Sequence, residues 1–499
     1  MPRLDCRRIA RTRRGSFVWL LVLGAWCIPA SPRATQAADF SQADAAAALK
    51  RAVEFYRTKV GYHGGYGYAV SADLAKREGE SKITATQAWM QPPATPAVGL
   101  AYLEAYRMTG EPYLLDAARE TAQCLIESQL TSGGWQNPIE SDPEKRRLHP
   151  YRKNVSSEGI KVAPKRELTT LDDNKTQSCL TFLMRLDAAT EFRDAELHEA
   201  AQYGLDSLVK VQYPNGAWPQ QFEGPPDPAK FSVKKASYPE SWSRTFPRIN
   251  YTEFYTFNDN TIADVVMLMV EAADTYGAAR YRDAAVKAGD FILLAQMPEP
   301  QPAWAQQYDA EMHPVWARKF EPPAITGSES QTVVKLLLEL YRRTGERKFL
   351  EPVPRAVAYL KRSVLPEGAV VARFYELHTN KPLYFTKQYE LTYDDSDLPT
   401  HYGFKVGAGG FDYYQEQYEK LVASGPPERK PAKKSGAGKL TAEVAAAAEQ
   451  VAGQLDERGA WVEDGKLDHW GENDSTRQII ASKTFIKNLQ TLARCAGAK

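Results

Sequence analysis

Two short loops of this chain carry acidic and amide side chains in nearly the same order. The loops span residues 171–176 and 257–261, and the side chains concerned are Asp172, Asp173, Asn174, Asp259 and Asn260. Carboxylate and amide oxygens are ligands that hard divalent cations take. Each loop also directly precedes a predicted helix, where Asp and Asn commonly cap free backbone N–H groups. Both interpretations stay open, and the recurrence of acids in two loops favours at least one acidic ligand from each.

The two loops belong to a longer repeat that must position them. A loop containing tryptophan and glutamine recurs at Trp135, Trp218 and Trp304, at sequence separations of 83 and 86 residues, with an echo at Trp461. A fixed period of this length is typical of helical hairpins stacked against their neighbours. Such stacking would place the acidic loops at one end of the stack, where they can converge.

Helical periodicity dominates the chain and supplies those hairpins. The predicted pairs are 95–109 with 113–130, 175–190 with 193–211, 261–276 with 279–296, and 328–344 with 347–364. Further helices are predicted at 41–59, 440–455 and 481–495. The connections within pairs are short, which makes the paired helices antiparallel. The predicted fold is therefore all-α, a toroid or barrel of antiparallel helical hairpins.

Three long segments without helical pattern separate the hairpins, at 137–168, 223–250 and 365–410. Connections of this length are uncommon in compact domains, so we expect them to form the walls of a binding groove. We predict a catalytic domain over 38–424 and a linker over 425–439. The helices of 440–499 are expected to close the toroid, because the loop at Trp461 repeats the internal pattern.

The N-terminal 37 residues are predicted to be a signal peptide. Five arginines between residues 7 and 14 precede an apolar run from Phe17 to Ala30, and small residues at 34–38 offer a cleavage site after Ala37. The run is short for a membrane span. We therefore predict a secreted or periplasmic protein, with a single-pass anchor as the alternative and no span in the mature chain.

Composition excludes several other classes. The net charge is +1, from 63 basic and 62 acidic residues, so nothing indicates a nucleic-acid partner. Three cysteines remain after cleavage, too few for a disulfide framework, and Cys124 and Cys179 are expected to be buried thiols. The chain has no zinc-protease, serine-hydrolase or phosphate-loop motif. We expect a monomer.

Five motifs in the region 85–410 resemble, in family order, those of the polysaccharide lyase family 10 pectate lyases. They are the Asp-Asp-Asn-Lys-Thr loop and the segments 213–220, 257–260, 317–330 and 372–383. The resemblance implies an incomplete α/α toroid and a Ca²⁺-assisted β-elimination on α-1,4-polygalacturonate, with an arginine as the base. On this basis Asp172, Asp173, Asn174, Asp259 and Asn260 are the expected Ca²⁺ ligands.

Arg318 is the predicted base, because it occupies the arginine of the Ala-Arg-x-Phe/Tyr-Glu-Pro-Pro motif. An ordinary guanidinium stays protonated far above neutral pH, so this role is chemically demanding. Nearby Ca²⁺ and other cations would lower its pKa and give an alkaline pH optimum. A salt bridge or a clamp for a substrate carboxylate is the alternative role.

Four further residues are expected to contact substrate: Arg373, Lys387, Lys175 and Trp218. Arg373 and Lys387 are interpreted as carboxylate clamps, although the family usually has Arg at the second position. Lys175 replaces a small residue, and either contacts substrate or is a solvated lysine. Since a tryptophan recurs in every unit, a structural wedge is the alternative for Trp218.

Glu321 and Glu329 are candidate ligands or supporting residues, and His149, His313 and His401 receive no role. The leading prediction is a secreted pectate lyase that releases 4,5-unsaturated oligogalacturonides from polygalacturonate or pectin. One alternative is a toroidal glycoside hydrolase with Asp172 or Asp173 and Asp259 as acid and base. Another is a uronan-binding homologue without catalysis.

Overall fold

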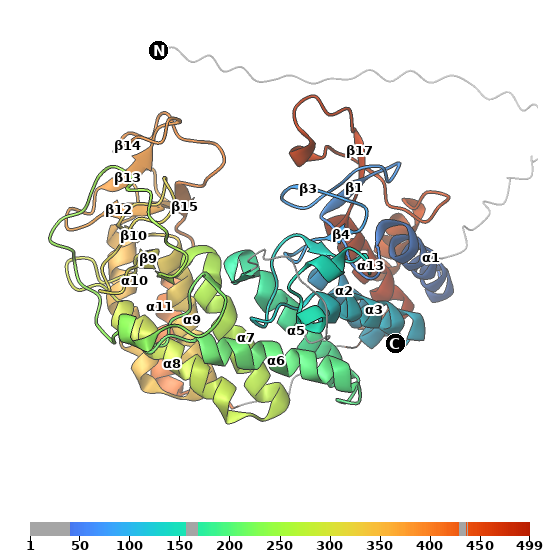
Figure 1. Cartoon of the computed structure of the whole chain (residues 1–499), viewed down its shortest axis with the longest axis horizontal. Coiled ribbons are helices and arrows are strands. Elements are labelled where there is room, and N and C mark those ends of the chain that lie inside the picture. The colour runs from blue at the N-terminus through green and yellow to red at the C-terminus, as the bar shows by residue number, and fades with distance from the viewer. Residues whose placement is uncertain (1–39, 156–167, 429–435, 437) are drawn as a thin grey trace, which may run out of the picture. The chain divides into compact units, whose positions relative to one another are not determined.

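The computed structural model describes residues 40–155, 168–428, 436 and 438–499, so the predicted signal peptide and most of the predicted linker lie outside the described residues. Consecutive α-helices form the body of the described chain (Figure 1). Their bounds are α1 Gln42–Phe55, α2 Thr95–Thr109, α3 Pro112–Ser128, α4 Arg152–Val155, α5 Lys175–Ala189, α6 Ala195–Val211, α7 Thr261–Tyr276, α8 Ala279–Ala295, α9 Glu329–Thr344, α10 Val353–Arg362, α11 Phe411–Ser424, α12 Ala442–Gly453 and α13 Ser482–Ala496.

The predicted hairpins are confirmed. Helices α2 and α9 both end at a glycine in the left-handed conformation, Gly110 and Gly345, with φ of 77° and 76°. Only glycine adopts this conformation at little cost, so each turn can start the next helix within a few residues. One predicted helix, 347–364, is wrong in detail. It is divided into a 3₁₀ turn, Arg347–Leu350, and α10, because Pro352 lies between them.

The hairpins pack in chain order. Helix α2 packs against α5, α5 against α7, α7 against α9, and α9 against α11 (Figure 1). At the other end of this series α13 packs against both α1 and α2, and α12 packs against α1 and α13. The all-α toroid of helical hairpins is thereby confirmed. The C-terminal helices join the N-terminal ones, whereas the exact domain boundaries stay a prediction. Helix α11 was not predicted.

Short strands occur in the connections and form no closed sheet in the described chain. Strand β6 (Thr169–Thr170) pairs with β7 (Gln221–Phe222), and β8 (Tyr255–Thr256) pairs with β9 (Gln307–Tyr308). Strand β10 (Ala324–Thr326) pairs with β12 (Phe374–Glu376), which continues through β13 (Pro382–Phe385) to β14 (Leu391–Thr392). The other strands are β1 Ala69–Ser71, β2 Arg77–Glu78, β3 Lys82–Ile83, β4 Gln87–Ala88, β5 Ile139–Glu140, β11 Val370–Ala372, β15 Lys405–Gly407, β16 Glu463–Asp464 and β17 Gln478–Ala481.

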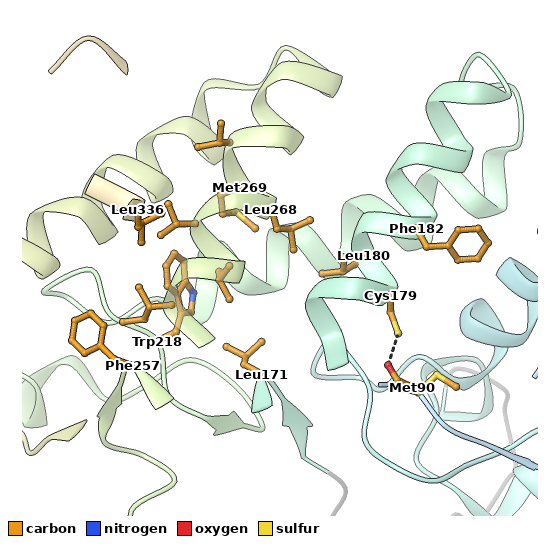
Figure 2. Close-up of a cluster of buried hydrophobic side chains, with 14 of the residues drawn as sticks. Met90, Leu171, Cys179, Leu180, Phe182, Trp218, Phe257, Leu268, Met269 and Leu336 are labelled. Atoms are coloured by element: carbon orange, nitrogen blue, oxygen red, sulfur yellow. Dashed lines mark hydrogen bonds between the residues drawn. The ribbon is translucent and has the colours of Figure 1, made fainter. Parts of the chain in front are cut away.

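The recurring tryptophans are wedges between hairpins. Trp135, Trp218 and Trp304 are completely buried. Each indole N–H donates to a carbonyl oxygen of the preceding helix, at 2.9, 2.8 and 2.9 Å. The prediction that Trp218 contacts substrate is wrong, because its ring is enclosed in the core and has no face to offer a sugar (Figure 2).

A glutamine after each second helix joins neighbouring repeats. The amide of Gln129 donates to the carbonyl oxygens of Gly133 and of Ala200 in α6, at 2.9 and 3.0 Å. Gln212 does the same toward Gly216 and toward Ala284 in α8, at 2.9 Å each. These amides satisfy buried carbonyls of two repeats at once. The sequence analysis did not identify them.

The core also holds the residues that precede the acidic loops. Leu171 and Phe257 are buried with Trp218, Leu268 and Leu336 in the cluster drawn in Figure 2. Each loop therefore begins from a residue fixed by packing. The three cysteines of the described chain are free and buried, as expected for Cys124 and Cys179. None of the described helices combines the length and apolar character that a membrane span requires.

Asp264 is an acidic residue that we expect to lower the stability of the folded protein. Asp264 of α7 lines a cavity between α7, α9 and α11. Burial is the cause that raises the pKa of Asp264 to about 6, and no charged or hydrogen-bonding partner among the described residues contributes to the shift. Because the pKa is higher in the folded state than in the unfolded state, stability falls as the pH rises from about 4 to about 6, and the loss persists above that range.

We expect Asp264→Asn to raise the free energy of unfolding at pH 8 by about 1 to 2 kcal/mol, because the variant has no charge to desolvate. The gain should be much smaller near pH 4, where the carboxyl is protonated in the folded state and about half protonated in the unfolded state. Denaturant unfolding of both proteins at the two pH values checks this. An equal effect at both pH values would contradict it.

We expect Trp218→Ala to destabilise the protein by about 3 to 5 kcal/mol, because a large buried side chain leaves a cavity. Thermal unfolding measures the loss, and Trp470→Ala, at a half-buried tryptophan, should cost less. A Trp218 variant of unchanged stability that only binds substrate more weakly would restore the substrate-binding role.

Candidate active site

The two acidic loops follow the same backbone path. In each, a 3₁₀ turn, Asp172–Asn174 or Asn258–Asn260, leads directly into a helix. Its last two residues are left-handed, with φ of 50° and 59° at Asp173 and Asn174 and of 46° and 60° at Asp259 and Asn260. Asp and Asn tolerate this region better than other residues with side chains. Two such residues in succession persist only where the surroundings enforce them.

The surroundings that enforce the loops are equivalent in the two repeats. Thr170 Oγ1 accepts the backbone N–H of Asp172 at 3.2 Å, and Thr256 Oγ1 accepts that of Asn258 at 3.0 Å. Gln220 Nε2 donates to Asp172 Oδ1 at 2.8 Å.

In the second repeat, Gln306 Nε2 donates to Asn258 Oδ1 at 2.7 Å. Gln220 and Gln306 both lie two residues after a wedge tryptophan. This spacing is the sequence signal that could have identified them as supports of the loops.

Three carboxylates converge where the loops meet. Oxygen atoms of Asp172, Asp173 and Asp259 lie within 4.8 Å of one another. Burial, and then the charge of Asp173, raise the pKa of Asp259 to about 6. We call these three residues the acidic cluster. Its hard oxygen donors fit Ca²⁺, and a bound cation would reduce the repulsion between the three carboxylates.

Capping does not explain the amides beside the cluster. Asn174 and Asn260 stand at the N-cap positions of α5 and α7, but neither side chain makes a capping hydrogen bond. Asn260 also contributes to the lining of the cavity between α7, α9 and α11. Their role as oxygen donors to a cation stays a prediction.

Lys175 lies against the acidic cluster. Its side chain is only 9% exposed, and Nζ is 3.2 Å from Asp173 Oδ2 and 3.7 Å from Asp172 Oδ2. The interpretation of Lys175 as a solvated lysine is therefore wrong. An ammonium group of the chain itself already neutralises part of the cluster's charge.

Arg318 lies on the other side of the cluster, with Nη2 3.7 Å from Asp259 Oδ2. Its Nε and Nη2 both donate to Glu321, whose side chain is 2% exposed. Burial alone would lower the pKa of Arg318, but pairing with Glu321 outweighs it, and the pKa is raised. Glu321 is thus a partner that orients Arg318 and does not belong to the acidic cluster.

Tyr402 joins Arg318 to Arg373. Its hydroxyl donates to Glu321 Oε1 at 2.9 Å. The guanidinium carbons of Arg318 and Arg373 lie 5.7 and 4.4 Å from its ring centroid. Arg373 Nη2 in turn contacts the buried Glu329 at 2.7 Å. Tyr402 was missed by the sequence analysis, because no motif surrounds it in the segment 384–410.

No contact among the described residues joins Lys387 to this group. Its side chain is 59% exposed and pairs with Asp397 at 3.0 Å. Arg244, in the segment 223–250, contacts the segment 365–410, which also contains Lys387. It pairs with Glu376 and lies near the ring of Tyr393, so two of the long segments are in direct contact.

The geometry can be compared with known proteins. A family model described as pectic acid lyase matches residues 144–408, which is more than half of the chain and contains every residue of this site. No curated protein matches the chain.

Several solved structures are similar to the chain. A family 10 polysaccharide lyase from Cellvibrio cellulosa is 19% identical, with 66% of this chain and 95% of that chain covered and a TM-score of 0.44. A mutant of that lyase in complex with trigalacturonic acid is also 19% identical, with coverage of 66% and 98% and a TM-score of 0.43. An α-mannanase from Bacteroides thetaiotaomicron is 10% identical, with coverage of 91% and 95% and a TM-score of 0.39.

The family model, rather than these distant structures, carries the assignment. The matched segment begins before the first acidic loop and ends beyond Tyr402. The chain belongs to the pectic acid lyase family and is a polysaccharide lyase enzyme.

Proposed function

We propose that this enzyme is a calcium-dependent pectate lyase that cleaves α-1,4-polygalacturonate by β-elimination. The observation that supports this most directly is the contact between the acidic cluster and Arg318, 3.7 Å apart at Asp259. Elimination next to a uronate carboxylate needs positive charge at the carboxylate and a group that takes the neighbouring C5 proton. A cation-binding cluster beside an arginine provides both.

The proposed ligands of Ca²⁺ are Asp172, Asp173 and Asp259, with Asn174 and Asn260 as further oxygen donors. A bound Ca²⁺ ion would neutralise the substrate carboxylate as it gains enolate character. Lys175 and Arg373 are proposed to bind carboxylates of the polymer. Lys175 has three ammonium hydrogens, and two of its nearest oxygens belong to the cluster.

In the reaction, the C5 proton leaves with the base and its electron pair forms the C4=C5 double bond. The C4–O4 bond breaks, and the leaving oxygen takes a proton from water. We propose Arg318 as the base. Glu321 holds its Nε and Nη2, which orients the guanidinium but also favours the protonated form. The proposal therefore requires alkaline pH or added positive charge at the cluster.

An inverting hydrolase receives less support from the geometry. An inverting glycosidase separates its two carboxyl groups by about 6.5 to 9.5 Å, which leaves room for a water. Oxygens of Asp172, Asp173 and Asp259 lie within 4.8 Å of one another. The predicted secretion and monomeric state stay predictions.

We expect purified protein to increase the ultraviolet absorbance of a polygalacturonate solution at alkaline pH, since elimination creates a conjugated double bond. Added CaCl₂ should raise the rate, and EDTA should abolish it. New reducing ends without absorbance would indicate hydrolysis and reject the lyase mechanism for this substrate.

We expect Arg318→Ala to lower kcat by about a thousandfold with a much smaller change in KM, because a base acts only in the transition state. Steady-state kinetics from neutral to alkaline pH measure this, with the exposed Arg193→Ala as a control that keeps full activity. A raised KM at unchanged kcat would instead make Arg318 a carboxylate clamp.

A further inference from the structure

The first acidic loop contains Lys175, whereas the second acidic loop has no lysine at the corresponding position. In the repeat, Asp173 corresponds to Asp259, Asn174 to Asn260 and Lys175 to Thr261. The paired backbone angles agree within a few degrees at the aspartates, with φ and ψ of 50° and 35° against 46° and 36°. The loop conformation therefore does not need a lysine, and the reason for its presence lies in its charge.

The ammonium of Lys175 is held by the cluster itself. Its nearest oxygens are those of Asp173 and Asp172, at 3.2 and 3.7 Å, and its side chain is 9% exposed. Burying a lysine is costly unless an opposite charge compensates it. Two carboxylates of the acidic cluster provide that compensation, so Lys175 and any divalent cation depend on the same oxygens.

We infer that Lys175 is a resident cation of the acidic cluster and that it weakens the binding of a divalent cation to the free enzyme. A metal ion bound by Asp172 and Asp173 must lie within a few ångströms of Nζ, or the ammonium must move away. Either course costs free energy, because like charges at this distance repel each other and moving the ammonium away breaks its contacts with Asp172 and Asp173. The inference rests on the calcium site of the proposed function.

Calcium binding to the free protein tests this directly, without any measurement of turnover. Full-length protein is stripped with EDTA, dialysed, and titrated with CaCl₂ by isothermal titration calorimetry. Lys175→Thr copies the residue that the second loop has at this place, and Lys175→Met keeps the length of the side chain. We expect both variants to bind calcium at least about tenfold more tightly than the wild type.

Two control variants separate the effect of the charge of Lys175 from the effect of substituting any lysine. Lys175→Arg keeps the positive charge and should keep the weak binding. Lys210→Thr removes an exposed lysine of α6 and should change nothing. The rise of the unfolding temperature with CaCl₂ gives a second readout, which should be larger in the two neutral variants, since a ligand of the folded state stabilises it.

Equal or weaker calcium binding in Lys175→Thr and Lys175→Met would overturn the inference. If neither the variants nor the wild type bind calcium, the inference fails together with the calcium site. The ultraviolet assay on EDTA-treated protein then shows separately whether the enzyme is still a lyase.

Discussion

Electrostatic repulsion among three carboxylates is the constraint on which this site depends. Asp172, Asp173 and Asp259 come from two repeats, and their oxygens lie within 4.8 Å of one another. Charges this close are held together only if the backbone is fixed and cations are near. The fold fixes the backbone with Leu171 and Phe257 in the core, and the chain supplies cations in Lys175 and Arg318. The packed helices, the buried tryptophans and the glutamine amides together hold neighbouring repeats in place, and thereby hold the two loops.

Much of the fold could be predicted, because it repeats. The helical periodicity, the short connections within pairs and the spacing of the tryptophans can all be read from the sequence. Helix α11 was not predicted. The short strands were not predicted either, since a strand of two residues is too short to give an alternating pattern in the sequence. The division of the helix at 347–364 was also missed, although Pro352 indicates it.

The site was predictable where a motif repeats or resembles a family. The cluster aspartates and Arg318 were expected, and they lie together. The burial of Lys175 could not be foreseen, because its acidic partners are close in sequence but the packing that shields its side chain depends on the fold. Tyr402 was missed for the same reason, being 81 residues from the glutamate that it contacts. For Trp218, sequence alone could not separate burial from exposure.

The pairing of Arg318 with Glu321 bears on catalysis in two opposite ways. It fixes the guanidinium in one orientation through two parallel hydrogen bonds, which is the geometry that makes such pairs strong. The same bonds stabilise the proton that a base has to lose. Tyr402 adds a further hydrogen bond to Glu321 at 2.9 Å. The pairing thus orients Arg318 but reduces the fraction of the guanidinium that is deprotonated at a given pH.

Gln306 gives this site an additional property. Its amide nitrogen donates to Asn258 Oδ1 and to Glu321 Oε1, at 2.7 Å each. One amide group has two hydrogens, and both are used. A rotation of that group would release the second acidic loop and the partner of Arg318 together. The two halves of the site therefore share one support, and the loss of the Gln306 amide would remove a hydrogen bond from each of them at once.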